Sequence, residues 1–254
     1  MSALASFHLV ATFGFVLASL AVAMRLLLLA RRTRQTPELY LGLGLLGTAV
    51  LGYGVLIAGA IARGPEVMVT DAFAPRALQA AGQALHDAGV SMIVLFVLTV
   101  FRPKERWAQG LAVALVAALW LGQIGWELEN RFRSGGRGNG FWWLRYAVIW
   151  SYPLWTMVES WRWYAIMRRR VQIGIADPIV ANRFLLWGTG ALGTALATWT
   201  SSIPFLLVGD PTVLLAWTPA IHVATALFGV ATVTVYYLTF FPPAAYRRWI
   251  AAAS

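Results

Sequence analysis

The sequence predicts an all-α integral membrane protein, a bundle of seven transmembrane helices that forms a single domain over residues 1–254. Composition is the first reason: 59% of the residues are hydrophobic and 12% are charged, about half the charged share of a soluble domain. The second reason is that apolar stretches of roughly 20 residues or more, the length that crosses a bilayer, recur along the whole chain. These stretches are 4–30, 38–62, 76–101, 107–126, 141–167, 182–207 and 212–241.

Basic residues between the predicted spans fall mostly on one side of the membrane. Twelve lie at one set of span ends: Arg31, Arg32, Arg34, Arg102, Lys104, Arg106, Arg168, Arg169, Arg170, Arg183, Arg247 and Arg248. Five lie on the other side: Arg63, Arg76, Arg131, Arg133 and Arg137. The positive-inside rule therefore predicts an outside N-terminus and a cytoplasmic C-terminus in a bacterial inner membrane. Because this topology explains the net charge of +10, we expect the lipid bilayer and no nucleic acid as partner.

Several kinds of chemistry are excluded by composition. The chain has no cysteine, so disulfides, iron–sulfur clusters and thiolate ligands are excluded. Its only lysine is Lys104, in an inner loop, so the seventh span has no lysine for a retinal Schiff base. No nucleophile elbow or Walker A loop is present. Whether the chain is an enzyme stays open.

Three histidines are the first candidate functional residues. His8, His86 and His222 lie in the first, third and seventh predicted spans, in the outer half of the membrane or near its middle. Each belongs to a stripe of polar or small residues, and such stripes face inward because polar groups are costly in lipid. We expect a polar pocket in the outer half between these three spans. The residues expected to bind a ligand there are His86, Asp87, His222, Gln83 and Thr218.

Three interpretations of this histidine set stay open. The side chains could hydrogen-bond across the bundle and fix its packing. His8, His86 and His222 could instead hold a metal or haem in a membrane enzyme or electron carrier, because imidazole suits zinc, copper and iron. The third interpretation is a pocket for an external ligand or a proton. Asp87 is expected to be paired, protonated or functional, since a carboxylate near the bilayer centre costs about 2.5–3.5 kcal/mol.

A second pair of ionisable residues lies in the fifth predicted span. Glu159 and Arg162 are three residues apart, a spacing that brings side chains together on a helix. We interpret them as a structural ion pair at the inner end of that span.

Short segments at the inner edge carry a resemblance to known proteins. Tyr236 to Pro243, followed by Tyr246 to Trp249, resembles the exit from the seven-helix sensor regions that precede bacterial histidine kinases. Val100 to Pro103, Ala176 to Pro178 and Asn182 to Phe184 are similar to segments of uncharacterised bacterial seven-helix proteins. The resemblance implies a receptor-like or sensory protein. Because no output module follows here, we expect signalling through a separate cytoplasmic partner; the alternative is a structural subunit of a larger membrane complex.

Overall fold

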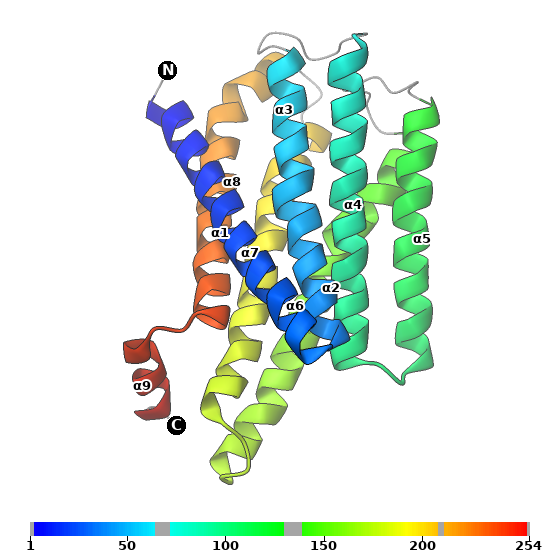
Figure 1. Ribbon diagram of the computed structural model, residues 1–254. Coiled ribbons are helices and arrows are strands. Elements are labelled where there is room, and N and C mark those ends of the chain that lie inside the picture. The colour runs from blue at the N-terminus through cyan, green and yellow to red at the C-terminus, as the bar shows by residue number, and fades with distance from the viewer. Residues whose placement is uncertain (1–2, 64–71, 130–138, 208–210, 253–254) are drawn as a thin grey trace. The chain divides into compact units, whose positions relative to one another are not determined.

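The computed structural model describes residues 3–63, 72–129, 139–207 and 211–252, with side chains described there except at 3–9, 63, 204–207, 211–216 and 222. Within these ranges the chain is helical and contains no strand, so the predicted all-α class is confirmed for the described residues (Figure 1). The helices are α1 (Ala3–Thr33), α2 (Thr36–Leu45), η1 (Leu46–Gly52), α3 (Tyr53–Arg63), α4 (Phe73–Phe101), α5 (Arg106–Glu129), α6 (Gly140–Gln172), α7 (Pro178–Leu207), α8 (Pro211–Phe240) and α9 (Ala244–Ala252).

Five helical segments among the described residues are long and apolar enough to cross a membrane. They are Val10–Thr33, Thr36–Ala62, Phe73–Phe101, Arg106–Glu129 and Trp217–Phe240, with mean hydropathies from 1.6 to 2.2. α6 and α7 are 33 and 30 residues long but are not among these five; Trp, Tyr and charged residues interrupt α6, and Gly, Thr and Ser interrupt α7. Length and composition thus indicate a multi-pass membrane protein.

The chain packs as two compact units. The α4 unit, Ser19–Tyr152, holds the end of α1, the helices α2 to α5 and the start of α6. The α7–α8 unit, Met1–Ala18 with Pro153–Ser254, holds the start of α1, the rest of α6, and α7 to α9.

In the α4 unit, α4 is the central helix. Val90, Val94 and Val97 are each at most 1% exposed, and they line one side of α4 at helical spacing. α4 lies between α3 and α5 in Figure 1, and both neighbours contact it. Burial on two sides makes α4 the helix on which a polar side chain is best shielded from lipid.

Glycines bring α2 and η1 very close to α4. A Cβ atom added at Gly47 would lie 2.7 Å from the Cα of Gly89, and one added at Gly44 would lie 2.6 Å from Cγ1 of Ile93. Such small residues let membrane helices approach closely and gain van der Waals contact. The glycine-rich second span therefore packs against α4 backbone to backbone.

The segment between α2 and α3 is π-helical. η1 ends at Gly52, where an added Cβ would lie 2.9 Å from the Cα of His86 on α4. π-helical turns are rare and frequently occur at functional sites. The end of this π-helical turn contacts the middle of α4, at His86.

In the α7–α8 unit, α7 and α8 pack along their length through small and aromatic residues. The Trp187 ring of α7 stacks on Tyr236 of α8 with 4.9 Å between ring centroids, and Phe240 meets Trp187 edge to face. Gly190 faces the Tyr236 ring and leaves room for it.

Candidate functional site

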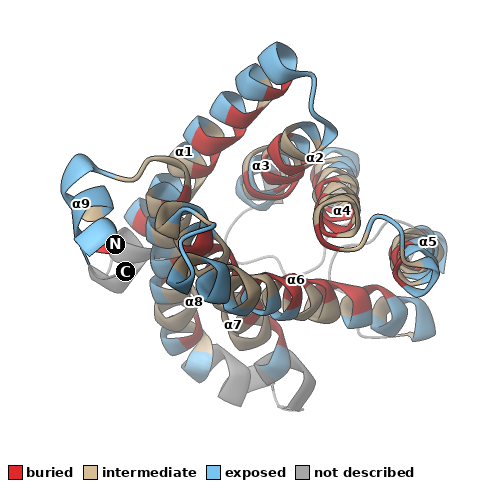
Figure 2. Ribbon diagram, turned by 90° about the horizontal axis from the view of Figure 1, so that it is seen from below, coloured by how far each residue is buried: buried red, intermediate tan, exposed pale blue. Residues whose placement is uncertain are grey.

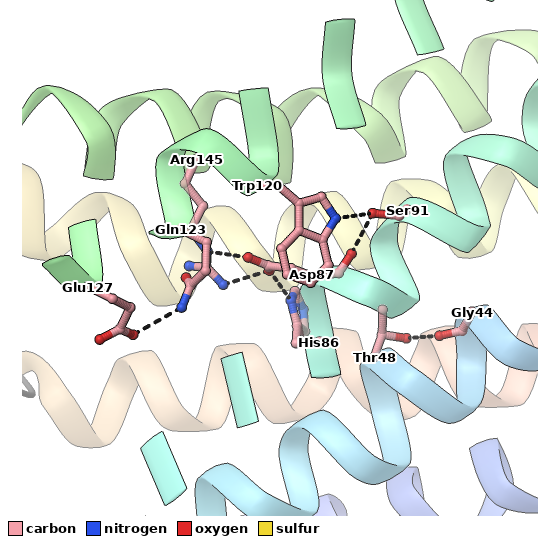
Figure 3. Close-up of polar contacts among 9 residues, drawn as sticks. All are labelled: Gly44, Thr48, His86, Asp87, Ser91, Trp120, Gln123, Glu127 and Arg145. Atoms are coloured by element: carbon pink, nitrogen blue, oxygen red, sulfur yellow. Dashed lines mark hydrogen bonds and ion pairs between the residues drawn. The ribbon is translucent and has the colours of Figure 1, made fainter. Parts of the chain in front are cut away.

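An ion pair buried inside the α4 unit joins α4 to α6. Asp87 lies in the middle of α4 and is 0% exposed, and Arg145 lies near the start of α6 and is 6% exposed. The Arg145 Nε donates to Oδ2 of Asp87 at 2.6 Å, and its Nη2 donates to Oδ1 at 2.7 Å (Figure 3). Two parallel bonds between a guanidinium and a carboxylate form the strongest and most directional ion pair in proteins.

A glycine on α5 allows this pair to form. A Cβ atom added at Gly122 would lie 2.7 Å from the backbone N of Arg145 and 2.8 Å from the carbonyl oxygen of Phe141. One turn further along α5, Gly125 leaves room for the Phe141 ring. α6 therefore begins in direct contact with α5, at a position from which Arg145 reaches Asp87.

His86 is the second partner of the Asp87 carboxylate. Its Nδ1 lies 3.1 Å from Oδ1 of Asp87, the oxygen that also accepts from Nη2 of Arg145. The imidazole and the Tyr53 ring meet edge to face, with 6.2 Å between ring centroids. Adjacent residues on a helix diverge by about 100°, yet here both side chains turn to one point, so a proton-binding ring and a guanidinium share one carboxylate.

α5 adds a second buried acid. The Gln123 Nε2 donates to Oε1 of Glu127 at 3.0 Å, and the two residues are 3% and 7% exposed. Glu127 interacts electrostatically with Arg145, so carboxylates on both α4 and α5 attract the guanidinium. The Oε1 atom of Gln123 is buried and has no hydrogen-bond partner among the described residues. We call His86, Asp87, Gln123, Glu127 and Arg145 the polar cluster.

Hydrogen bonds from Ser91 and Trp120 hold α4 and α5 together one turn away from Asp87. The indole Nε1 of Trp120 donates to Oγ of Ser91 at 3.1 Å, and that hydroxyl donates to the backbone carbonyl of Asp87 at 2.8 Å (Figure 3). These contacts fix the α4 backbone that carries Asp87.

The sequence-predicted site residues are divided between the two units. His86, Asp87 and Gln83 lie on α4, where the Oε1 atom of Gln83 is buried without a hydrogen-bond partner among the described residues. Thr218 is half-buried on α8. His8 and His222 belong to α1 and α8, but their side chains lie outside the described residues, so the expected pocket between the first, third and seventh predicted spans stays a prediction. Where side chains are described, no three His, Asp or Glu residues form a group that could hold a metal.

The second predicted pair lies in the α7–α8 unit. An Nη1 atom of Arg162 lies 3.6 Å from Oε2 of Glu159, whose side chain is 4% exposed while that of Arg162 is 50% exposed. The contact links neighbouring turns of α6, and its structural role stays a prediction.

Sequence reasoning missed Arg145, Gln123 and Glu127. A signal for Arg145 was present: Asp87 is an uncompensated acid in one predicted span, and Arg145 is a base five residues into another. Comparison with protein-family models, with curated proteins and with solved structures gave no match.

Proposed function

We propose that this chain is a receptor-like protein of seven membrane-spanning helices in a bacterial inner membrane, which responds to protonation of the polar cluster from the outer side. Its N-terminus would be outside and its C-terminus cytoplasmic, as the distribution of arginines favours. The lengths of α6 and α7, 33 and 30 residues, support two spans in addition to the five apolar ones. A cytoplasmic partner would receive the signal.

The observation that carries the proposal is the fully buried Asp87–Arg145 pair. Replacing a buried ion pair by apolar residues is often neutral or stabilising, so such a pair is weak support for a purely structural role. Ionisable residues inside membrane helices instead mark ligand sites, proton relays and voltage sensors. The pair joins two different helices, so a change in its charge changes how those helices pack.

The geometry suggests how a proton would act. Imidazole can carry a proton on both ring nitrogens, and a charged His86 would place a second cation on the carboxylate that holds Arg145. Glu127 offers Arg145 an alternative acceptor on α5. Protonation of His86 would therefore favour movement of the Arg145 side chain from Asp87 toward Glu127, and α6 would be released from α4 while it stays in contact with α5. Tyr53 from α3 also faces His86, and its phenol is uncharged between about pH 5 and about pH 8.

The distance between α4 and α6 tests this proposal directly. Because the chain has no cysteine, spin labels can be placed through Ala72→Cys and Gly140→Cys, two exposed positions at the starts of α4 and α6. We expect the distance between the labels to increase reversibly between about pH 8 and about pH 5, and to stay constant in Glu127→Gln. A Glu159→Gln/Arg162→Gln variant is the matched control and should respond as the parent does.

A purely structural role for the polar cluster predicts another result. The distance between the labels would then be the same at both pH values in the parent chain. That result would refute the proton response and leave the Asp87–Arg145 pair as a fixed contact between helices.

A further inference from the structure

α9 is a short amphipathic helix that follows the last candidate membrane span. That span ends at Phe240, and α9 runs over Ala244–Ala252 after Pro242 and Pro243. At about 100° per residue, Tyr246, Trp249 and Ile250 share one side of α9 while Arg247 and Arg248 share the other. Such a pattern is typical of helices that lie in the plane of a membrane interface.

A hydrogen bond to α7 and a buried apolar side chain help to hold α9 to its unit. The Nδ2 atom of Asn182 on α7 donates to the Tyr246 hydroxyl at 3.0 Å, and Ile250 is 8% exposed. Trp249 stacks on Tyr246 but is 65% exposed. Figure 2 shows most of α9 in the exposed colour, so its aromatic edge and its arginines are available to a partner.

The charge around this junction is strongly positive. Arg247 and Arg248 are exposed on α9, and exposed Arg183 follows Asn182 on α7. No acidic residue occurs after Asp210 in the sequence, so neither arginine of α9 has a carboxylate on its own helix. Asp177, the only acid between Glu159 and Asp210, uses Oδ1 to accept from the backbone N of Ile179.

We propose that α9 is an interfacial helix that binds anionic phospholipid headgroups through Arg183, Arg247 and Arg248, with Trp249 inserted at headgroup level. These exposed arginines complement the phosphodiester and the negative surface potential of an anionic leaflet. An exposed Trp beside arginines, directly after a span, is the arrangement found at membrane interfaces. This inference does not depend on the polar cluster or on its proton response.

The test uses the full chain in nanodiscs made of phosphatidylcholine alone or of phosphatidylcholine mixed with phosphatidylglycerol. Hydrogen exchange of the α9 amides should be slower in the discs that contain phosphatidylglycerol. Arg247→Gln/Arg248→Gln should lose this added protection, by a factor on the order of thirty for two arginines at a charged surface. The matched control is Arg31→Gln/Arg32→Gln, which replaces an exposed arginine pair at the end of α1 and should leave the exchange rates of the α9 amides unchanged.

The unaltered chain in the two lipid compositions tests the binding of α9 to anionic headgroups even if a variant fails to fold. Equal exchange of α9 in both kinds of disc would overturn the proposal. It would also be overturned if the control pair reduced the protection of α9 as much as the α9 pair does.

Discussion

At the scale of single residues, the polar cluster depends on one carboxylate. Asp87 is 0% exposed and receives bonds from Arg145 and His86, so removal of this carboxylate leaves the Arg145 guanidinium without its acceptor. The cost of an unpaired buried charge exceeds the benefit of the pair itself. The free energy of unfolding should therefore respond differently to the loss of one partner and to the loss of both.

Asp87→Asn and Arg145→Gln should each lower the free energy of unfolding by about 3–5 kcal/mol, because each leaves one buried charge unpaired. The double replacement Asp87→Leu/Arg145→Met should restore the parent value or exceed it by about 1–4 kcal/mol. Denaturant titration in mixed micelles measures all three. A double variant as unstable as the two single variants would show that the charges themselves hold the helices together.

Glu105, in the loop between α4 and α5, gives a pH-dependent prediction outside the membrane spans. Hydrogen bonds from Arg102 and Trp107 to this carboxylate lower the pKa of Glu105 below its usual value. A carboxylate with a lowered pKa stabilises the fold above its unfolded-state pKa, near 4.3, and loses that contribution as pH falls through the folded-state pKa.

The thermal midpoint of the parent should therefore exceed that of Glu105→Gln at neutral pH, and the difference should vanish in the acid range. Arg102→Gln should shrink the difference at neutral pH, because it removes the first of the two donors. A difference between parent and Glu105→Gln that is constant with pH would contradict this assignment.

At the scale of helices, close contacts between α4, α5 and α6 position the charged side chains. Gly122 on α5 meets the backbone of Arg145, and Gly110 on the same helix has open space around it. The two glycines form a matched pair for substitution by alanine. Only the first should disturb the polar cluster.

Gly122→Ala should destabilise the protein by about 1–3 kcal/mol, because the added methyl group forces α5 and α6 apart. Gly110→Ala should be neutral or stabilise by up to about 1 kcal/mol, because alanine is the better helix former. Unfolding in mixed micelles compares them. Equal effects of the two substitutions would show that α5 and α6 are not in close contact at Arg145.

Helix positions could be predicted from the sequence, whereas their contacts could not. The predicted range 76–101 corresponds to Phe73–Phe101 and 107–126 to Arg106–Glu129, because hydrophobic length and proline placement determine these ends. The π-helical turn over Leu46–Gly52 depends on a shift of backbone hydrogen bonds that no side-chain pattern encodes. Arg145 was missed because its partner lies 58 positions earlier in the chain.

At the scale of the whole molecule, the account requires the starts of α4 and α6 to lie on the outer side of the membrane. The C-terminal ends of these two helices must then lie on the cytoplasmic side. A chain without cysteine allows a clean test. In intact cells, Ala72→Cys should react with a membrane-impermeant maleimide, whereas Lys104→Cys should react only after the membrane is permeabilised. The opposite pattern would reverse the topology and place the polar cluster on the cytoplasmic side.

The central claim is that the Asp87–Arg145 pair serves a change in helix packing on protonation, and that it does not serve to stabilise the fold. The most direct test is the distance between spin labels at positions 72 and 140 in Asp87→Leu/Arg145→Met, measured between about pH 8 and about pH 5. The account predicts that this folded variant keeps the neutral-pH distance of the parent and no longer changes with pH. A pH-dependent increase equal to that of the parent would contradict it.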